Sequence, residues 1–133
     1  MGWALVVRNA QADTTPPSYD LGIDSASDDA SLALFTTDSD QPLAVHAFHA
    51  EGTMTRALLG EIAAFLERAG IDRRQIGRIA VTTGPGQYGA LRAGIAVAQG
   101  LAVALAIPLA GIGRLQADAA CVGESAGLPI VAV

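Results

Sequence analysis

The sequence predicts an α/β domain: a three-strand antiparallel meander, then a helix, a strand and a second helix, with the helices packed on a mixed sheet. Three β-type runs come first, separated by short turns rich in Asp, Ser and Pro, and connections this short favour antiparallel pairing. Two helix-length apolar segments follow, with the β-type run RIAVTT between them. Because 51% of the residues are apolar, the chain can build a packed core.

The length of 133 residues suits one domain and is too short for two. Residues 1–19 end in a polar, proline-containing stretch, so we expect a disordered or extended leader, or one that is an artefact of the start site. Residues 20–133 form the predicted domain. Its last residues, LPIVAV, read as an apolar strand within which the sequence ends, so we expect a fold cut short.

The meander is predicted from the runs LGIDSAS, ASLALFTT and PLAVHAFHA, which start at residues 21, 30 and 42. Asp28 and Asp29 are expected to form an Asx-type hairpin turn between the first two. His46 and His49 lie three positions apart on the third run, so they point to opposite faces and cannot share one metal ion. We expect solvated or edge histidines.

The first helix is predicted from Thr53, as its N-cap, to about Ala69, with a stop at Gly70. A helical stripe of apolar residues runs along it, with Glu61 as the exception. Further apolar residues widen that surface beyond what a helix with one solvent-exposed side requires. They are Leu59, Ala63 and Leu66.

The second helix is predicted from Ala90 to about Ala106, and Arg92 is its one charge. Such a segment is buried on more than one side. It is either a core helix between sheet and helix, or one of its faces meets another chain. Arg92 either pairs with a carboxylate across the core or interface, or caps the neighbouring loop. A strand at 109–112 and a helix over 114–122 are expected to follow.

Composition excludes several classes of function. All eight basic residues are arginine, and thirteen acids bring the net charge to −5, so direct nucleic-acid binding is not expected. The lone Cys121 excludes an internal disulfide and a thiolate zinc site, and reads as a buried, inert thiol. No apolar run approaches the ~20 residues of a membrane span, so we expect a cytoplasmic protein. Neither a catalytic constellation nor a metal site can be assembled, and we expect no enzymatic activity.

Three glycines, Gly84, Gly86 and Gly89, spell G-x-G-x-x-G after the run RIAVTT. A dinucleotide site would need an acidic residue about twenty positions further on, yet no acid lies between Arg92 and Asp118. Pro85 also stiffens the turn, and a meander comes first in place of a βαβ unit. A Walker loop requires the lysine that this chain lacks.

The stretch GPGQYGALRAG resembles the segment GPGSFTGLRIG of the TsaB family, also called YeaZ. It keeps six of that segment's residues, namely Gly84, Pro85, Gly86, Leu91, Arg92 and Gly94. The following run, GIAVAQGLAVALAIPLAGIGRLQADA, is similar to the family's G-I-A-x-A-x-G-L-A…P…G-V-S-x-L…A. The opening LGIDSASDDASLALF resembles L-A-I-D-T-S-T…A-S-V-A-L. The resemblance covers residues 20–133.

The chain departs from the family in three places. Gln87, Tyr88, Gly89 and Ala90 replace Ser-Phe-Thr-Gly, so two hydroxyls are absent. Asp-Ser-Ala-Ser at residues 24–27 replaces Asp-Thr-Ser-Thr. The second lobe of the family is expected to be missing or truncated.

The resemblance implies an RNase H-like lobe of the actin/Hsp70 (ASKHA) type. It also implies a non-catalytic scaffold that binds the TsaD ATPase during synthesis of N6-threonylcarbamoyladenosine on tRNA, with ATP, ADP or Mg²⁺ held only through that partner. Some relatives carry glycoprotease or peptidase M22 labels. Residues expected to shape the loop, or to lie near a vestigial nucleotide site, are Asp24, Ser25, Gly84, Pro85, Gly86 and Gly89. Residues expected at the partner interface are Leu58, Ile62, Leu91, Arg92, Gly94, Ile95, Ala98 and Leu101.

Two alternatives stay open. The chain could be a small actin-like ATPase or hydrolase in which Asp24, at the end of the first strand, holds a metal ion. It could also be a degenerate family member that forms homodimers through the same helices.

Overall fold

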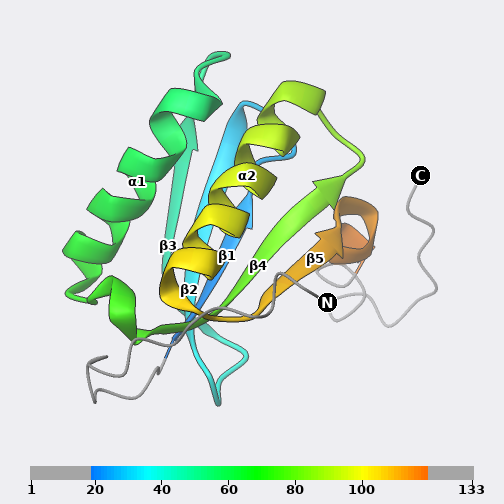
Figure 1. Cartoon of the computed structure of the whole chain (residues 1–133). Helices are drawn as coiled ribbons and strands as arrows, with labels where there is room; N and C mark the ends of the chain where they lie inside the picture. The colour runs from blue at the N-terminus through cyan, green and yellow to red at the C-terminus, as the bar shows by residue number, and fades with distance from the viewer. Residues whose placement is uncertain (1–18, 120–133) are drawn as a thin grey trace.

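A computed structural model describes residues 19–119 of the chain as a five-stranded mixed sheet with two long helices on one face (Figure 1). The elements in chain order are β1 (Tyr19–Asp24), β2 (Asp29–Thr36), β3 (Pro42–His49), α1 (Met54–Ala69), the 3₁₀ turn η2 (Arg73–Gln75), β4 (Ile76–Gly84), α2 (Tyr88–Leu105) and β5 (Leu109–Gly113). Residues 114–119 are helical. The predictions for the leader, for Cys121 and for the terminal strand fall outside the described residues.

The strands are ordered β3-β2-β1-β4-β5. β1 pairs antiparallel with β2, and β2 pairs antiparallel with β3, which is the predicted meander. β4 lies parallel to β1 on its other side and β5 lies parallel to β4. The predicted fold class, a meander followed by helix, strand and helix on a mixed sheet, is confirmed.

α1 begins and ends where the sequence predicts, with Thr53 at the N-cap position and Gly70 after the last turn. Gly70 takes the left-handed conformation, with φ of 69°, and its N–H donates to the last-turn carbonyl of Glu67, a common use of glycine after a helix. Thr53 precedes the helix, but its side chain makes no cap hydrogen bond. Its hydroxyl donates instead to the carbonyl oxygen of Ala50, so Thr53 is the N-cap residue as predicted but does not cap the helix with its side chain.

The turn between β1 and β2 also differs from expectation. Asp24 Oδ1 accepts a hydrogen bond from the N–H of Ala26 at 3.1 Å, which makes Asp24 the Asx-turn residue. The Ser27 hydroxyl in turn accepts from the N–H of Asp29 at 3.2 Å. Asp24 therefore takes the Asx role that was expected of Asp28 and Asp29, because Asp28 ends the turn and Asp29 begins β2.

The core lies between the sheet and the inner sides of both helices. The largest fully buried side chains come from β1, β2, α1 and β4, and they are Leu21, Leu32, Leu34, Leu58, Ile76 and Ile79. Glu61, the polar residue on the apolar stripe of α1, pairs with His46 of β3 at 2.7 Å. Each buried aliphatic side chain of this size contributes roughly 1.5–3 kcal/mol to folding.

α2 meets the length and composition expected of a membrane-spanning helix, although the apolar run was expected to be too short. In the structure it packs against β4 and α1. Its buried residues are small or medium in size, and they are Ala90, Leu91, Ala93, Gly94, Ala98 and Ala102. Because these lie on one side, the prediction that this helix is buried on more than one side is wrong for the described residues.

Candidate functional site

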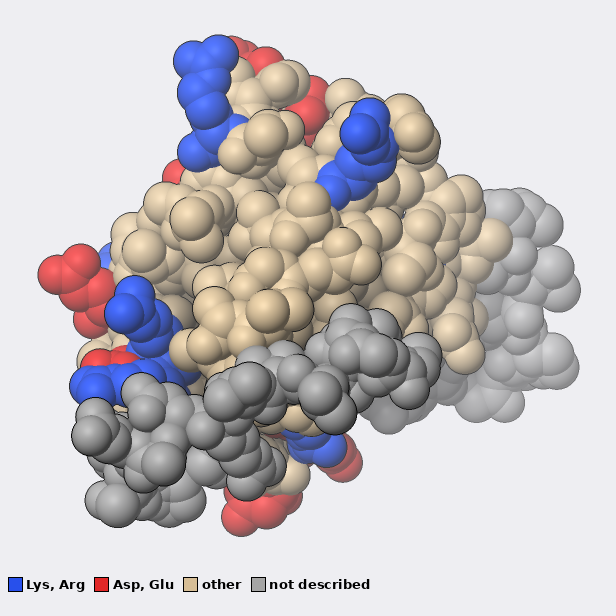
Figure 2. All heavy atoms as spheres, in the orientation of Figure 1, with Lys and Arg blue, Asp and Glu red and all other residues tan. Residues whose placement is uncertain are grey.

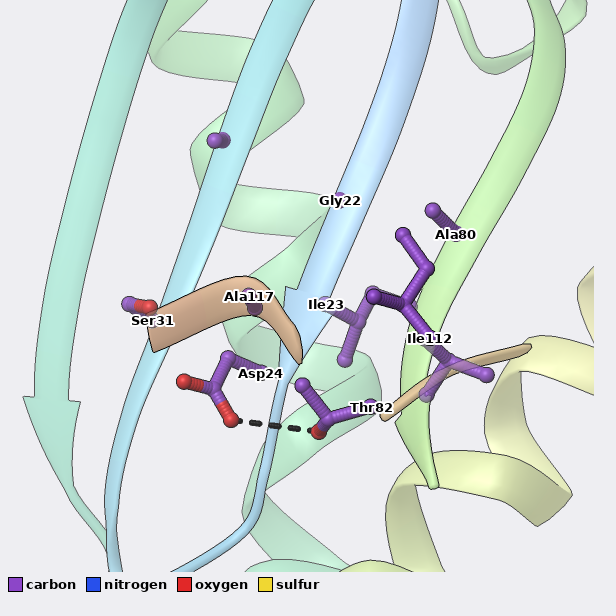
Figure 3. Close-up of a pocket in the computed structure, with 10 residues that line it drawn as sticks. Gly22, Ile23, Asp24, Ser31, Ala80, Thr82, Ile112 and Ala117 are labelled. Atoms are coloured by element: carbon purple, nitrogen blue, oxygen red, sulfur yellow. Dashed lines mark hydrogen bonds between the residues drawn. The ribbon is translucent and has the colours of Figure 1, made fainter. Parts of the chain in front are cut away.

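The parallel strands β1 and β4 end side by side and bring Asp24 and Thr82 together (Figure 3). The Thr82 hydroxyl donates to Asp24 Oδ1 at 3.1 Å and accepts from the N–H of Ser25 at 3.2 Å. Ligands of open α/β sheets bind beyond the carboxyl ends of such strands. Both residues also line a shallow hollow of about 180 Å³ on the sheet face opposite α1 and α2.

The glycine loop rests on the turn after β1. The N–H of Gln87 donates to the carbonyl oxygen of Ala26 at 2.7 Å. A Cβ atom added to Gly86 would lie 2.4 Å from that same oxygen, so a larger residue cannot approach this closely. Gly84 has φ of 115°, a conformation that favours glycine, and the Gly84–Pro85 peptide is cis. Gly86 thus permits the close contact between the two loops, and Gly84 permits the backbone conformation at the end of β4.

α2 also approaches the turn after β1, at Gly94 in the second turn of the helix. A Cβ atom added to Gly94 would lie 1.9 Å from Ser25 Oγ and 2.9 Å from Ser25 Cβ. The Ser25 side chain is fully buried, and its hydroxyl oxygen has no hydrogen-bond partner in the described structure. Ser25 therefore contributes to this contact through its small size and not through a hydrogen bond of its hydroxyl.

Arg114, directly after β5, joins this site to the helical segment 114–119. Its Nη1 lies 3.3 Å from Asp24 Oδ2, and its Nε donates to both carboxylate oxygens of Asp118 at 3.0 and 3.2 Å. The hydrogen bond to Asp118 and then the charge of Asp24 raise the pKa of Arg114 above its ordinary value. Asp24 thus accepts two hydrogen bonds at Oδ1 and has the Arg114 cation beside Oδ2.

Among the site residues that the resemblance implied, Asp24 and Ser25 lie beside the turn on which the glycine loop of Gly84, Pro85 and Gly86 rests. Gly89 is exposed, with open space around its Cα.

Sequence reasoning missed Thr82 and Arg114. The signal for Thr82 was its position in the parallel strand that ends beside Asp24. Arg114 carried no such signal, because only the fold places a residue 90 positions later beside Asp24.

Most of the residues expected at a partner interface are core residues. Leu58, Ile62, Leu91, Gly94 and Ala98 face the sheet and are buried, while Ile95 and Leu101 are half-buried. Arg92 alone of the set is exposed. The reason is physical: an apolar stripe marks the side of a helix that packs on the sheet, so the same residues cannot also face a partner.

A different set of residues forms the exposed side of the two helices. We call it the outer helical face, and it comprises Leu59, Gly60 and Ala63 of α1 with Ala96, Gly100 and Val103 of α2. Leu59 is 55% exposed and Val103 is 49% exposed. Figure 2 shows this side of the molecule, where uncharged atoms cover the middle and charged groups lie toward its margins.

Arg92 and Tyr88 form a pair at the N-terminal end of the outer helical face. The guanidinium carbon of Arg92 lies 5.3 Å from the centre of the Tyr88 ring, within the range of a cation–π contact. Tyr88 is 74% exposed. Neither expected role of Arg92, pairing with a carboxylate or capping the loop, is seen in the described structure.

The two histidines lie on opposite faces of the edge strand β3, as expected. His46 faces α1, where its ring stacks between Phe48 and Phe65 with centroids 5.7 and 6.0 Å away. His49 is exposed and pairs with Asp29 of β2 at 2.6 Å. Among the described residues, no group of three or more His, Cys, Asp or Glu side chains is placed to hold a metal ion.

A family model and the curated relatives that match this chain carry the same description. Residues 48–133 match the sequence model of a family described as "TsaD: tRNA N6-adenosine threonylcarbamoyltransferase". Proteins of that name from Paraburkholderia xenovorans and Methylobacillus flagellatus are 38% and 35% identical, and each match covers 72% of this chain and 32% of the relative. The chain therefore spans about a third of these relatives.

Solved structures agree with this result. YeaZ from Pseudomonas aeruginosa superposes with a TM-score of 0.70 and 28% identity, covering 83% of this chain and 50% of that chain. A second structure is titled as an uncharacterized protein with similarity to peptidase YEAZ from the same organism, and its TM-score is 0.72. These matches fit the expected RNase H-like lobe of the actin type.

The expectation that the chain is not an enzyme is wrong, because the curated relatives are named as a transferase. The sequence test relied on finding a nucleophile or a paired-histidine metal motif. An enzyme that works mainly by positioning phosphate groups and stabilising their charge requires neither of these within one lobe.

Proposed function

The chain belongs to the TsaD family of tRNA N6-adenosine threonylcarbamoyltransferases, and we propose that it takes part in threonylcarbamoyladenosine formation on tRNA as a TsaB-like lobe that binds a TsaD-like ATPase. The structural likeness to YeaZ supports the assignment within the family. The proposed setting is the cytoplasm. We expect the partner to hold the tRNA, because this chain carries net negative charge and would repel the phosphate backbone.

The observation that carries the proposal is the outer helical face. Its residues are apolar or glycine on both helices, and two of them are large aliphatic side chains that stand about half exposed. Apolar patches of this kind with charged margins mark protein-binding surfaces. Gly60 and Gly100 have open space around their Cα atoms, so a partner helix could approach the backbone closely there.

The pair of Tyr88 and Arg92 extends this surface toward the N-terminal end of α2. Tyr and Arg are the residue types that most often carry binding energy at interfaces. The guanidinium rests on the ring and leaves its N–H groups for an acceptor on the partner. We therefore expect the TsaD-like partner, or a second copy of this chain, to place a helix along α1 and α2.

The test is binding of the purified full chain to the TsaD-like protein of its own organism, measured as mass in solution by light scattering. A one-to-one complex is expected for the native sequence. Ala96→Glu and Val103→Glu should weaken it at least tenfold, because each would bury an unpaired charge. Ala47→Glu is the matched control, since it adds the same charge at an exposed alanine on the opposite face of the sheet.

The outcomes separate the alternatives. A monomer that does not bind the TsaD-like protein overturns the proposal. A homodimer that is indifferent to that protein, and that Val103→Glu dissociates, supports a homodimeric relative in place of the heterocomplex. Formation of threonylcarbamoyladenosine on tRNA by the reconstituted proteins, with and without this chain, then tests whether binding serves the reaction.

A further inference from the structure

An actin-like ATPase is expected to place a metal-handling carboxylate where Asp24 stands, at the end of β1. The residues around Asp24 do not fit that role. Oδ1 accepts from the N–H of Ala26 and from the Thr82 hydroxyl, both at 3.1 Å, and Oδ2 faces the Arg114 guanidinium at 3.3 Å. A Mg²⁺ ion needs oxygen ligands at about 2.0–2.1 Å in octahedral geometry, and here an arginine occupies the approach to the carboxylate.

We infer that Arg114 is the resident counter-ion of Asp24 and takes the place that a divalent cation would need. This inference concerns the ends of β1 and β5, so it is independent of the proposed helical interface.

The geometry of Arg114 supports a fixed position. Its Nε donates to both oxygens of Asp118, four residues later in the helical segment 114–119, so the guanidinium lies between two carboxylates. The side chains of Asp24 and Arg114 are each about one-third exposed. An arginine keeps its charge at every physiological pH, so a cation reaching Asp24 would meet a positive group that cannot be neutralised by losing a proton.

The hydroxyl that bonds Asp24 is also engaged elsewhere. Thr82 uses its hydroxyl both as donor to Asp24 and as acceptor from the N–H of Ser25. The buried hydroxyl of Ser25 packs against Gly94. Removal of the Arg114 charge would leave Asp24 and Asp118 as two carboxylates facing one gap, and that pairing attracts a divalent cation.

The experiment measures Mn²⁺ binding to the full chain by electron paramagnetic resonance of the free ion. The native chain is expected to show no binding that depends on Asp24. Arg114→Gln should bind Mn²⁺ at least about tenfold more tightly than the native chain because the competing charge is gone. The double variant Asp24→Asn, Arg114→Gln should lose that gain.

Two controls isolate the charge at this position. Arg114→Lys keeps a cation and should behave as the native chain. Arg78→Gln removes the same charge from a pair with Asp20 that also joins β4 to β1, and it should not create a site. Asp24-dependent binding by the native chain, or no gain in Arg114→Gln, would overturn the inference.

A second measurement does not depend on metal. Urea unfolding of Asp24→Asn, Arg114→Gln and the double variant forms a double-mutant cycle. Coupled residues should give non-additive changes in the unfolding midpoint. Additive changes would show that the two side chains do not act as a pair, and that result also overturns the inference.

Discussion

Gly94 of α2 and Ser25 of the β1–β2 turn approach so closely that no side chain fits between them. A Cβ atom at Gly94 would lie 1.9 Å from Ser25 Oγ. This contact sets how near α2 lies to the carboxyl end of β1, and hence where the glycine loop meets the turn after Asp24. The position of α2 therefore depends on Gly94 having no side chain.

Gly94→Ala should lower the free energy of unfolding by roughly 1–3 kcal/mol, because the added methyl group overlaps Ser25. Urea denaturation measures the change. Gly100→Ala on the same helix is the matched control, since nothing lies within 4 Å of its Cβ position, and it should stabilise by about 0.5–1 kcal/mol. Ser25→Gly combined with Gly94→Ala should recover much of the loss. Equal effects of Gly94→Ala and Gly100→Ala would contradict the close approach.

Ser25→Ala should leave stability unchanged or raise it by up to about 1 kcal/mol, because it removes a buried hydroxyl that has no partner. Thr82→Val, nearly the same in shape, should cost about 1–3 kcal/mol, since it strips the buried N–H of Ser25 of its acceptor. Thermal unfolding of the two variants side by side gives the comparison. A loss on Ser25→Ala as large as on Thr82→Val would mean that the Ser25 hydroxyl does make a hydrogen bond.

Gly70→Ala should cost about 1–2 kcal/mol because Gly70 has φ of 69°, where a Cβ atom is strained. Gly60→Ala, in the middle of the same helix and in open space, should instead stabilise by roughly 0.5–1 kcal/mol. Unfolding midpoints in urea distinguish the two signs. If both substitutions stabilise, the helix does not end in the left-handed conformation described.

His49 should titrate above 6.5, because its hydrogen bond to Asp29 and then the charges of Asp29, Glu51 and Asp28 raise its pKa. Its folded value exceeds the unfolded one, so its contribution to stability is complete below pH 6.5 and is lost as the pH rises through the raised value. An NMR titration of the ring resonances gives the pKa. Asp29→Asn should bring it back toward 6.5, while Asp38→Asn in the β2–β3 turn should not. An unchanged pKa in Asp29→Asn would exclude the pair.

The periodicity of the sequence predicted the elements in their correct order. Strand-like runs, the stop at Gly70 and the apolar stripe of α1 each act within a few residues, so local patterns report them. The Asx turn at Asp24 was assigned to Asp28 and Asp29 because composition alone does not say which carboxylate reaches a backbone N–H.

The site could be predicted only in part. The family motif located Asp24 and the glycine loop, but Arg114 reaches Asp24 through the sheet order, which no local pattern encodes. The interface residues were misplaced because the most apolar helix positions mark the side that faces the sheet. The outer helical face is less apolar. It can be recognised as a candidate interface only once the fold shows which side of each helix packs on the sheet.

The position of β1 between an antiparallel and a parallel neighbour has a consequence for the order of folding. Its pairing with β2 closes a tight hairpin, whereas its bond to β4 joins Asp24 to Thr82 across 58 positions. Loop-closure entropy delays contacts between distant parts of a chain. We therefore expect the β1–β2–β3 hairpins to gain amide protection first during refolding. The Asp24 site would then be completed only in a later step, when β4 docks.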